Sequence, residues 1–337
     1  MNRTRFLAGA SALVLLRPSP AWATGGLEDD PDFDAPRTPR SEVGRSETPG
    51  AIRVRVPKNG DAGYRGTLTD FGDTRINTLS VEEYLLGVVP LEMPSAWPQA
   101  ALEAQAVVAR TYALRRRNGT RPYDLVAGTG DQMYGGLSAE KPTGSAAVMA
   151  TSDTIVTYTP PGRSEKSLAN VAYMSCCGGH TADSELLWGF DIPYLHGVAD
   201  PYCAAAPSSS WSIALDWRGL ARSLGLGDGA TLRSVSLIGS PGARPSALRL
   251  VADTSQDIEI RELRRLARPQ LPSAYLRSVD LRGAGEERTL VVNGSGHGHG
   301  VGLCQWGARG MALAGATTAQ IIAFYFPGTS LGLNRSL

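Results

Sequence analysis

Residues 82–114 read EEYLLGVVPLEMPSAWPQAALEAQAVVARTYAL and contain two helix signals. Ser80 and Glu83 form an S-x-x-E capping box, which predicts a short helix over the first part of the stretch. Glu92 follows as the one acid of an otherwise uncharged run that three prolines hold stiffly. The stretch thus predicts two helices joined by a rigid connection that carries Glu92.

The second helix is indicated by small and apolar side chains at steps of three and four residues. They are Trp97, Ala100, Ala101, Ala104, Val107, Val108, Thr111 and Leu114. This spacing predicts one apolar helical face, and the alanines allow neighbouring backbone to approach closely. We expect Ser95 to cap this helix, Pro98 to lie in its first turn, and the cations at 115–119 to suit its C-terminal end.

Short β-type runs surround these helices. Residues 51–56, AIRVRV, alternate as a half-buried strand does, and similar short runs recur from 150 to 260. The tail is expected to form two helices split at Gly315, with Thr317 and Gln320 as a second capping box. The pattern predicts an α+β fold, with a mixed sheet packed against helices and the alanine-rich helix following Glu92.

The N-terminus has the organisation of a secretory signal. Residues 1–23 begin with MNRTR, which carries two arginines, and continue with an apolar run of 11 residues and the sequence AWA. That run is too short to span a bilayer, which needs about 20 residues. We therefore predict cleavage, export to the periplasm, cell wall or outside, and no membrane span afterwards. Residues 24–50 predict a disordered linker, and 51–337 the folded part, in which about 205–290 could form a subdomain.

Composition excludes some classes of function. The chain has 337 residues, 42% of them hydrophobic, which is enough for a substantial core. Its formal net charge is +1, so it lacks the basic bias of proteins that bind nucleic acid through phosphates. It also has no P-loop and no H-E-x-x-H motif.

Glu92 is the first candidate for chemistry. Its neighbours Leu91 and Met93 favour partial desolvation, which raises the pKa of a carboxyl group. A raised pKa is what general acid catalysis near neutral pH requires. Alternatively, Glu92 could be a surface residue or could interact with the dipole of the helix that follows.

The cysteines allow two kinds of site. Cys177 and His180 have C-x-x-H spacing, and with Cys203 they could form part of a zinc site. In an exported protein, a disulfide of Cys203 with Cys177 or Cys176 is the simpler interpretation, and we favour Cys177–Cys203. Cys304 lies in an apolar run and could be a buried thiol.

Two glycine-rich segments also carry polar side chains. In GSGHGHGVG, His297 and His299 could bind metal, donate to a substrate, or satisfy buried backbone. In GTGDQMYGG, Gln132 and Tyr134 offer an amide and a phenol that suit a sugar, although the segment could be an ordinary turn.

Four blocks together resemble the SpoIID/LytB family of bacterial cell-wall proteins. They are residues 82–114, DQMYGG at 131–136, SCCGGHTADSELLW at 175–188, and GHGHGVGLCQWGARGMALAG at 296–315. With the strands between them, the resemblance covers roughly 50–330. It implies a lytic transglycosylase that cuts denuded peptidoglycan strands and leaves 1,6-anhydro-N-acetylmuramic acid ends. The family also contains enhancers of N-acetylmuramoyl-L-alanine amidase, which is the alternative function, with an amidase as partner.

The resemblance also implies roles for residues. Glu92 matches the catalytic glutamate of the family's EMP motif, and Asp131 and Asp183 are the nearest other acids in the motifs. Arg110 could orient substrate or pair with Glu103. No cofactor is required, although zinc has been associated with the sporulation member. Polar residues of the family motifs that could line a sugar groove are Gln132, Tyr134, Ser175, Thr181, His299 and Gln305.

Overall fold

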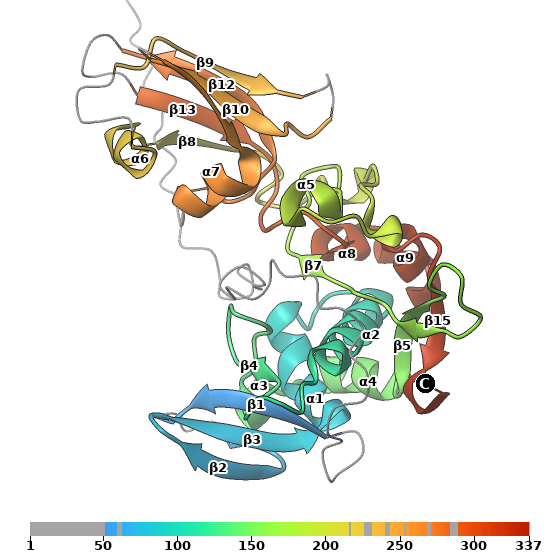
Figure 1. The fold of residues 1–337 in the computed structure, drawn as a ribbon. Helices are drawn as coiled ribbons and strands as arrows, with labels where there is room; N and C mark the ends of the chain where they lie inside the picture. The colour runs from blue at the N-terminus through green and yellow to red at the C-terminus, as the bar shows by residue number, and fades with distance from the viewer. Residues whose placement is uncertain are drawn as a thin grey trace, which may run out of the picture.

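The computed structural model describes residues 51–58, 63–215, 217–225, 231–239, 243–252, 254–267, 271–283 and 289–336. The predicted signal peptide and linker lie outside these residues. The fold is α+β with mixed sheets, as the sequence predicted (Figure 1).

The first sheet has the strand order β2-β3-β1-β4 and is mixed, since β1 pairs antiparallel with β3 and parallel with β4. Its strands are β1 (Ala51–Pro57), β2 (Thr67–Phe71), β3 (Thr74–Ser80) and β4 (Leu125–Val126). In β1, Ile52, Val54 and Val56 are buried, which confirms the alternation read from the sequence. This sheet leads directly into α1 (Val81–Glu92), whose capping box forms as predicted.

The alanine-rich helix is α2 (Gln99–Arg116), and it lies at the centre of the molecule (Figure 1). It packs against α1, α4 (Pro142–Ala150), α8 (Gln305–Leu313), α9 (Thr318–Tyr325) and β5 (Thr154–Tyr158). Most of its residues are therefore buried, so the prediction of a single apolar face is wrong. Small side chains let so many elements approach one helix, and this also buries the polar residues Gln105 and Arg110.

The start of α2 differs from the expected cap. Pro98 occupies the N-cap position and makes no side-chain cap hydrogen bond. Ser95 does not cap the helix; its carbonyl oxygen accepts a hydrogen bond of 2.8 Å from Thr143 of α4. The second capping box, Thr317 with Gln320 in α9, forms as predicted, and Gly315 separates α8 from α9.

Two small sheets connect distant parts of the chain. One sheet has the order β15-β5-β6, in which the C-terminal strand β15 pairs with β5. The other sheet has two strands, β14 and β7, which pair parallel. The latter pair brings the segment of the cysteine motif beside the start of α8. Further bounds are β6 (Ser167–Leu168), β7 (Tyr173–Met174), β14 (Leu303–Cys304), β15 (Ser330–Leu333), α3 (Gly136–Ala139), α5 (Ser184–Trp188) and the 3₁₀ helices η2 (Pro193–Leu195), η3 (Pro201–Cys203) and η5 (Asn334–Ser336).

The described residues between 211 and 294 include two further three-stranded antiparallel sheets at one end of the molecule (Figure 1). Their orders are β11-β10-β9 and β12-β13-β8, and α6 and α7 lie beside them. The bounds are β8 (Trp211–Leu215), β9 (Ser234–Ile238), β10 (Ala247–Val251), β11 (Ser255–Glu259), β12 (Leu276–Arg282), β13 (Thr289–Gly294), α6 (Trp217–Ser223) and α7 (Ile260–Leu266).

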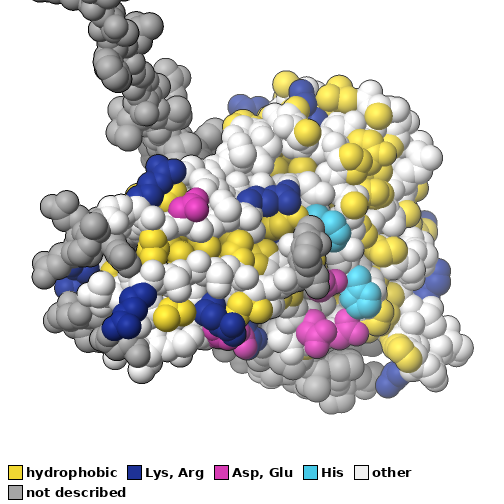
Figure 2. Space-filling view, turned by 90° about the horizontal axis from the view of Figure 1, so that it is seen from above, with side chains coloured by type: hydrophobic (Ala, Val, Ile, Leu, Met, Phe, Trp, Pro, Cys, Tyr) yellow, Lys and Arg dark blue, Asp and Glu magenta, His cyan; other side chains and the backbone are white. Residues whose placement is uncertain are grey.

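The length and polarity of the helices and the distribution of basic side chains bear on whether membranes or nucleic acids are partners. Within the described residues, every helix is too short or too polar to cross a bilayer. On the face in Figure 2, Lys and Arg side chains lie in separate places among apolar and polar ones.

Candidate active site

Glu92 is the last residue of α1, and its side chain is fully buried. The helix continues to this point because the backbone N–H of Met93 still donates to the carbonyl of Val89, at 3.0 Å. The alternative in which Glu92 caps the start of α2 is wrong, since no side chain caps this helix, which begins at Gln99 after the N-cap residue Pro98. Glu92 lies instead at the negative end of its own helix dipole, which disfavours a carboxylate.

Burial is the largest influence on the acidity of Glu92. It raises the pKa of this carboxyl group from 4.5 to about 7. The backbone N–H of Met133, which donates to Oε1 at 2.7 Å, opposes the rise, and so do the Tyr173 phenol and the Gln305 amide. Near neutral pH both the protonated and the ionised forms are therefore populated, as a group that first donates and then accepts a proton requires.

A set of buried polar side chains from different elements surrounds this carboxyl group. The Nε2 of Gln132 donates to the Tyr173 hydroxyl at 3.3 Å, and the Nε2 of Gln305 donates to Oε1 of Gln105 at 3.4 Å. Within the described part of the chain, several of their buried atoms lack a hydrogen-bond partner: Glu92 Oε2, Tyr84 Oη, Gln105 Nε2 and Gln132 Oε1.

Unpaired buried polar atoms are costly, about 1–3 kcal/mol each. Folded proteins leave few of them, and each one calls for an explanation such as a catalytic or ligand-binding role. Here both donors and acceptors are unpaired close to one carboxyl group. A ligand rich in hydroxyl groups can satisfy both kinds.

The other acids of the motifs serve local structure. Asp131 accepts from the Tyr112 hydroxyl at 2.7 Å, lies 3.2 Å from the Arg116 guanidinium, and accepts from a backbone N–H of β4. Asp183 precedes α5 and accepts from the backbone N–H of Gly197 at 2.8 Å. The groups that oppose the raised pKa of Glu92 are an amide N–H, a phenol and a carboxamide.

His299 and Tyr134 make hydrogen bonds to structural partners near the site. The Nδ1 of His299 accepts from the Val301 N–H at 3.0 Å, so the Nε2–H donates to the carbonyl of Tyr173, at 2.9 Å. His299 thereby fixes the strand that presents the Tyr173 phenol. Tyr134 points toward β3 and donates to Asn77 at 2.8 Å.

An aromatic pair is formed by Trp306, which follows Gln305 in sequence, and Trp97, which lies just before α2. The rings of Trp306 and Trp97 lie 5.0 Å apart in an edge-to-face arrangement, and Arg309 lies over both. The backbone of Ser175 holds this pair in place, because its carbonyl accepts from the Trp306 N–H at 3.1 Å. Both tryptophans are partly exposed.

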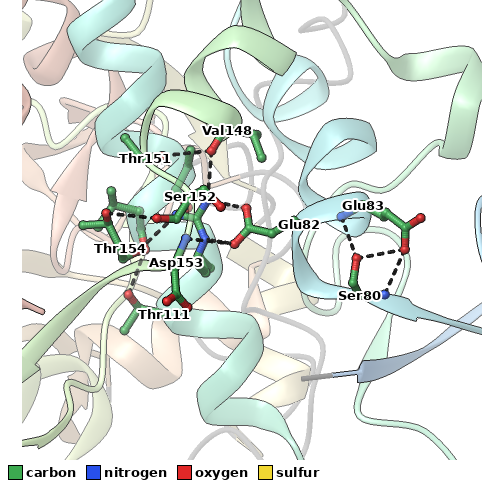
Figure 3. Close-up of polar contacts among 12 residues, drawn as sticks. Ser80, Glu82, Glu83, Thr111, Val148, Thr151, Ser152, Asp153 and Thr154 are labelled. Atoms are coloured by element: carbon green, nitrogen blue, oxygen red, sulfur yellow. Dashed lines mark hydrogen bonds and ion pairs between the residues drawn. The ribbon is translucent and has the colours of Figure 1, made fainter. Parts of the chain in front are cut away.

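Arg110 does not join the Glu92 group, which corrects the expectation that it orients substrate. Its guanidinium is fully buried and forms a two-bond ion pair with Glu82, with both distances 2.7 Å. It also donates to the carbonyls of Val148 and Thr154, which lie with Glu82 in Figure 3. The alternative partner Glu103 accepts instead from a threonine of α9. Arg110 thus ties α1 and α2 to α4 and to the start of β5.

Three more motif residues have structural partners. Thr181 accepts from the backbone N–H of Val198 at 2.7 Å. His297 exchanges two backbone hydrogen bonds with Cys176. The Nδ1 of His180 lies 2.7 Å from the carbonyl oxygen of Thr181.

The cysteines are all free and buried, so the expected Cys177–Cys203 disulfide is not formed. Their sulfur atoms lie 3.6 Å apart. Both belong to a buried group with Asp200 and Cys304, whereas His180, expected as a ligand with them, is not part of it. This group is where the described residues could hold a metal ion.

Sequence reasoning missed Gln105, Tyr84 and Tyr173 as members of the site. Gln105 carries a signal that could have been used, since it is the one uncharged polar residue inside the run of small side chains in α2. From the sequence alone, Tyr84 and Tyr173 look like ordinary aromatic residues of the core. Their relation to Glu92 depends on contacts between α1 and β7 that no local pattern encodes.

Comparison with known proteins shows that the chain belongs to the SpoIID/LytB family. A family model described as "Stage II sporulation protein" (SpoIID) matches residues 70–158. An uncharacterized protein of Brachyspira hyodysenteriae is 35% identical over 280 residues, which span 80% of this chain and 72% of that protein. The Stage II sporulation protein D of Bacillus subtilis is 27% identical over 274 residues, 76% of this chain and 75% of that protein. The Bacillus subtilis amidase enhancer is 28% identical over 293 residues, 73% of this chain but 40% of that protein.

Proposed function

Because the chain belongs to the SpoIID/LytB family, we propose that it is an exported peptidoglycan lytic transglycosylase. It cleaves denuded glycan strands and leaves 1,6-anhydro-N-acetylmuramic acid ends. The observation that carries this proposal is one fully buried carboxyl group, Glu92, whose pKa of about 7 permits both proton donation and proton acceptance.

In the first step, protonated Glu92 donates its proton to the glycosidic oxygen next to the muramic acid. The C1–O bond breaks with an oxocarbenium-like charge on the sugar, and the leaving sugar takes the proton as a hydroxyl group. Glu92 is then a carboxylate. In the second step it removes the proton of the C6 hydroxyl, whose oxygen bonds to C1, so Glu92 returns to its protonated form.

One carboxyl group suffices for this cycle because the nucleophile is part of the substrate. Ordinary glycosidases need a second carboxylate to activate water or to bond to the sugar. A second carboxylate close by would raise the pKa of Glu92 further. Among the described residues, burial is the one cause of the rise, which is consistent with the single-acid cycle. Asp131 is tied to Tyr112 and Arg116, so it is not available as the second acid.

The neighbouring groups supply substrate contacts. The unpaired polar atoms of Gln105 and Gln132 can donate to and accept from sugar hydroxyls. The Trp97–Trp306 pair offers an apolar surface for a sugar face, next to Gln305. Glu92 is fully buried, so a contact that covers its side chain must open before substrate can reach Oε2. We expect the glycine-rich segment around Met133, whose N–H donates to Glu92, to move away.

A second candidate function is the enhancement of an N-acetylmuramoyl-L-alanine amidase. The relative named amidase enhancer supports it, although this chain spans 40% of that protein. An enhancer needs glycan binding but no titrating carboxyl group, so the two functions differ in what they require of Glu92.

The test is digestion of denuded glycan strands by the wild type and by Glu92→Gln, with products identified by mass spectrometry. Glu165→Gln is the matched control, because it makes the same substitution at an exposed position. We expect anhydro-muramic ends from the wild type and the control, and at least a hundredfold fewer from Glu92→Gln.

The other outcomes are equally informative. Reducing ends in place of anhydro ends would show hydrolysis and require a second carboxylate. Intact strands that all three proteins bind equally would refute the transglycosylase and favour the enhancer, which a purified amidase acting on peptidoglycan that still carries its stem peptides, with and without this protein, would then reveal.

A further inference from the structure

A group of four buried side chains outside the Glu92 site has no part in the proposed chemistry. Its ligand atoms, three sulfurs and one carboxylate oxygen, all lie within 4.8 Å of one another. They come from the loop after β7, the start and end of η3, and the residue before α8. The members are Cys177, Asp200, Cys203 and Cys304.

We propose that Cys177, Asp200, Cys203 and Cys304 bind one structural zinc ion. Zinc prefers four ligands in a tetrahedron, with thiolate sulfur as its commonest structural donor. Four protein ligands leave no open position for water, as in structural rather than catalytic sites. A donor set rich in sulfur also disfavours magnesium and calcium, which prefer oxygen ligands.

The separations in the group fit a tetrahedral ion. Zinc–sulfur bonds of about 2.3 Å place two ligand sulfurs about 3.8 Å apart in a tetrahedron. The Cys177 and Cys203 sulfurs are 3.6 Å apart, much farther than the roughly 2.05 Å of a disulfide bond. The Cys177 sulfur also lies 3.1 Å from Oδ2 of Asp200.

Surrounding donors are arranged for negatively charged ligands. The Cys304 sulfur accepts from the backbone N–H groups of Cys177, at 3.2 Å, and Gly307, at 3.3 Å. Asp200 accepts from the Tyr202 N–H and from the Tyr325 hydroxyl, both at 2.9 Å. Hydrogen bonds of this kind orient metal ligands and are as much a part of a site as the ligands themselves.

Two arginines offset the negative charge that three thiolates and a carboxylate would leave on a zinc ion. Arg244 donates to the carbonyl of Cys177 at 2.6 Å, and Arg277 to that of Gly178 at 2.9 Å. Gly307 leaves space for the Asp200 carboxylate and the Tyr325 hydroxyl, since a Cβ atom at this position would overlap both.

The site has a consequence for the rest of the molecule. Cys304 immediately precedes Gln305, whose amide acts on Glu92, and Trp306 of the aromatic pair. A zinc ion would therefore join the loop after β7 and η3 to the start of α8 and fix the orientation of the residues that face the Glu92 site. The zinc proposal does not depend on the glycan chemistry.

The test is the zinc content of the protein purified from the compartment to which it is exported, without reducing agent. We expect one zinc ion per chain. X-ray absorption at the zinc edge of the wild type should show sulfur ligands at about 2.3 Å and one shorter oxygen ligand. This measurement needs no variant, so it remains decisive even where a substitution prevents folding.

Four variants then test the identity of the ligands. In competition with a chromophoric zinc chelator, Cys304→Ser and Asp200→Asn should bind zinc at least tenfold more weakly than the wild type. His180→Ala is the matched control and should retain wild-type affinity, since His180 lies outside the group. Cys176→Ser tests the neighbouring thiol, which contacts the thiols of Cys203 and Cys304. The proposed ligand set predicts that this variant also keeps wild-type affinity.

Three results would overturn the proposal. The first is a zinc-free protein in which peptide mapping finds a Cys177–Cys203 disulfide. The second is unchanged zinc affinity in Cys304→Ser. The third is loss of zinc in His180→Ala, which would restore the ligand set that the C-x-x-H spacing suggested.

Discussion

Replacement of Glu92 by glutamine should stabilise the protein at alkaline pH, although it removes the proposed catalytic group. The pKa of Glu92 is raised from 4.5 to about 7, so between these values the folded state binds more protons than the unfolded state. The free energy of unfolding of the wild type therefore falls as pH rises through this window. At about 1.36 kcal/mol per pH unit, the full loss above pH 7 is about 3 kcal/mol.

Glutamine is uncharged at every pH and keeps the oxygen that can accept from the Met133 N–H. The stability of Glu92→Gln relative to the wild type should thus be near zero around pH 4.5, rise through pH 6, and level off near 3 kcal/mol above pH 7. Urea denaturation of both proteins, followed by tryptophan fluorescence at several pH values, measures this difference directly.

The pH dependence of the difference is what tests the reasoning. The exposed control Glu165→Gln should stay within about 0.5 kcal/mol of the wild type at every pH. A difference between Glu92→Gln and wild type that does not change with pH would refute a raised pKa. A difference of the opposite sign at alkaline pH would show that the carboxylate is stabilised, and that Glu92 is then no general acid.

Three further changes have defined outcomes. Arg110→Met should destabilise the fold by about 3–5 kcal/mol in urea denaturation, because it leaves Glu82 and two backbone carbonyls without their buried partner. Trp306→Ala should raise KM for glycan strands about five- to tenfold with a smaller effect on kcat, since one stacking surface contributes about 1–1.5 kcal/mol; an unchanged KM in strand digestion would exclude a stacking role. Gly307→Ala should lower stability by about 1–3 kcal/mol and weaken zinc binding in the chelator assay, because the added methyl group overlaps Asp200; retention of both would contradict the packing around that carboxylate.

Local features of this protein could be predicted from the sequence because they depend on neighbours in the chain. Both capping boxes formed as expected, since each joins residues three positions apart. The strand at 51–56 and the split of the tail at Gly315 formed for the same reason. Local patterns were less reliable where they compete: Pro98 occupies the N-cap position of α2, although Ser95 offers a capping side chain.

Other properties required the tertiary structure because they arise between distant segments. Arg110 pairs with Glu82, 28 residues earlier, rather than with Glu103, which lies about two turns away in the same helix. Asp200 and Cys304 join Cys177 and Cys203 only because β14 pairs with β7 and η3 packs against α8. The sequence identified two of these four ligands and offered His180 in place of the others.

Glu92 shows the division most clearly. The sequence by itself determined that a single acid lies in a stiff, apolar run, and this was sufficient to select it. The prediction that this run joins two helices was wrong, since Glu92 is the last residue of α1. Its pKa of about 7 was decided by the tertiary structure, since desolvation depends on every group that excludes water from the carboxyl group. Those groups come from α1, the segment around Met133, β7 and α8, and only folding brings them together.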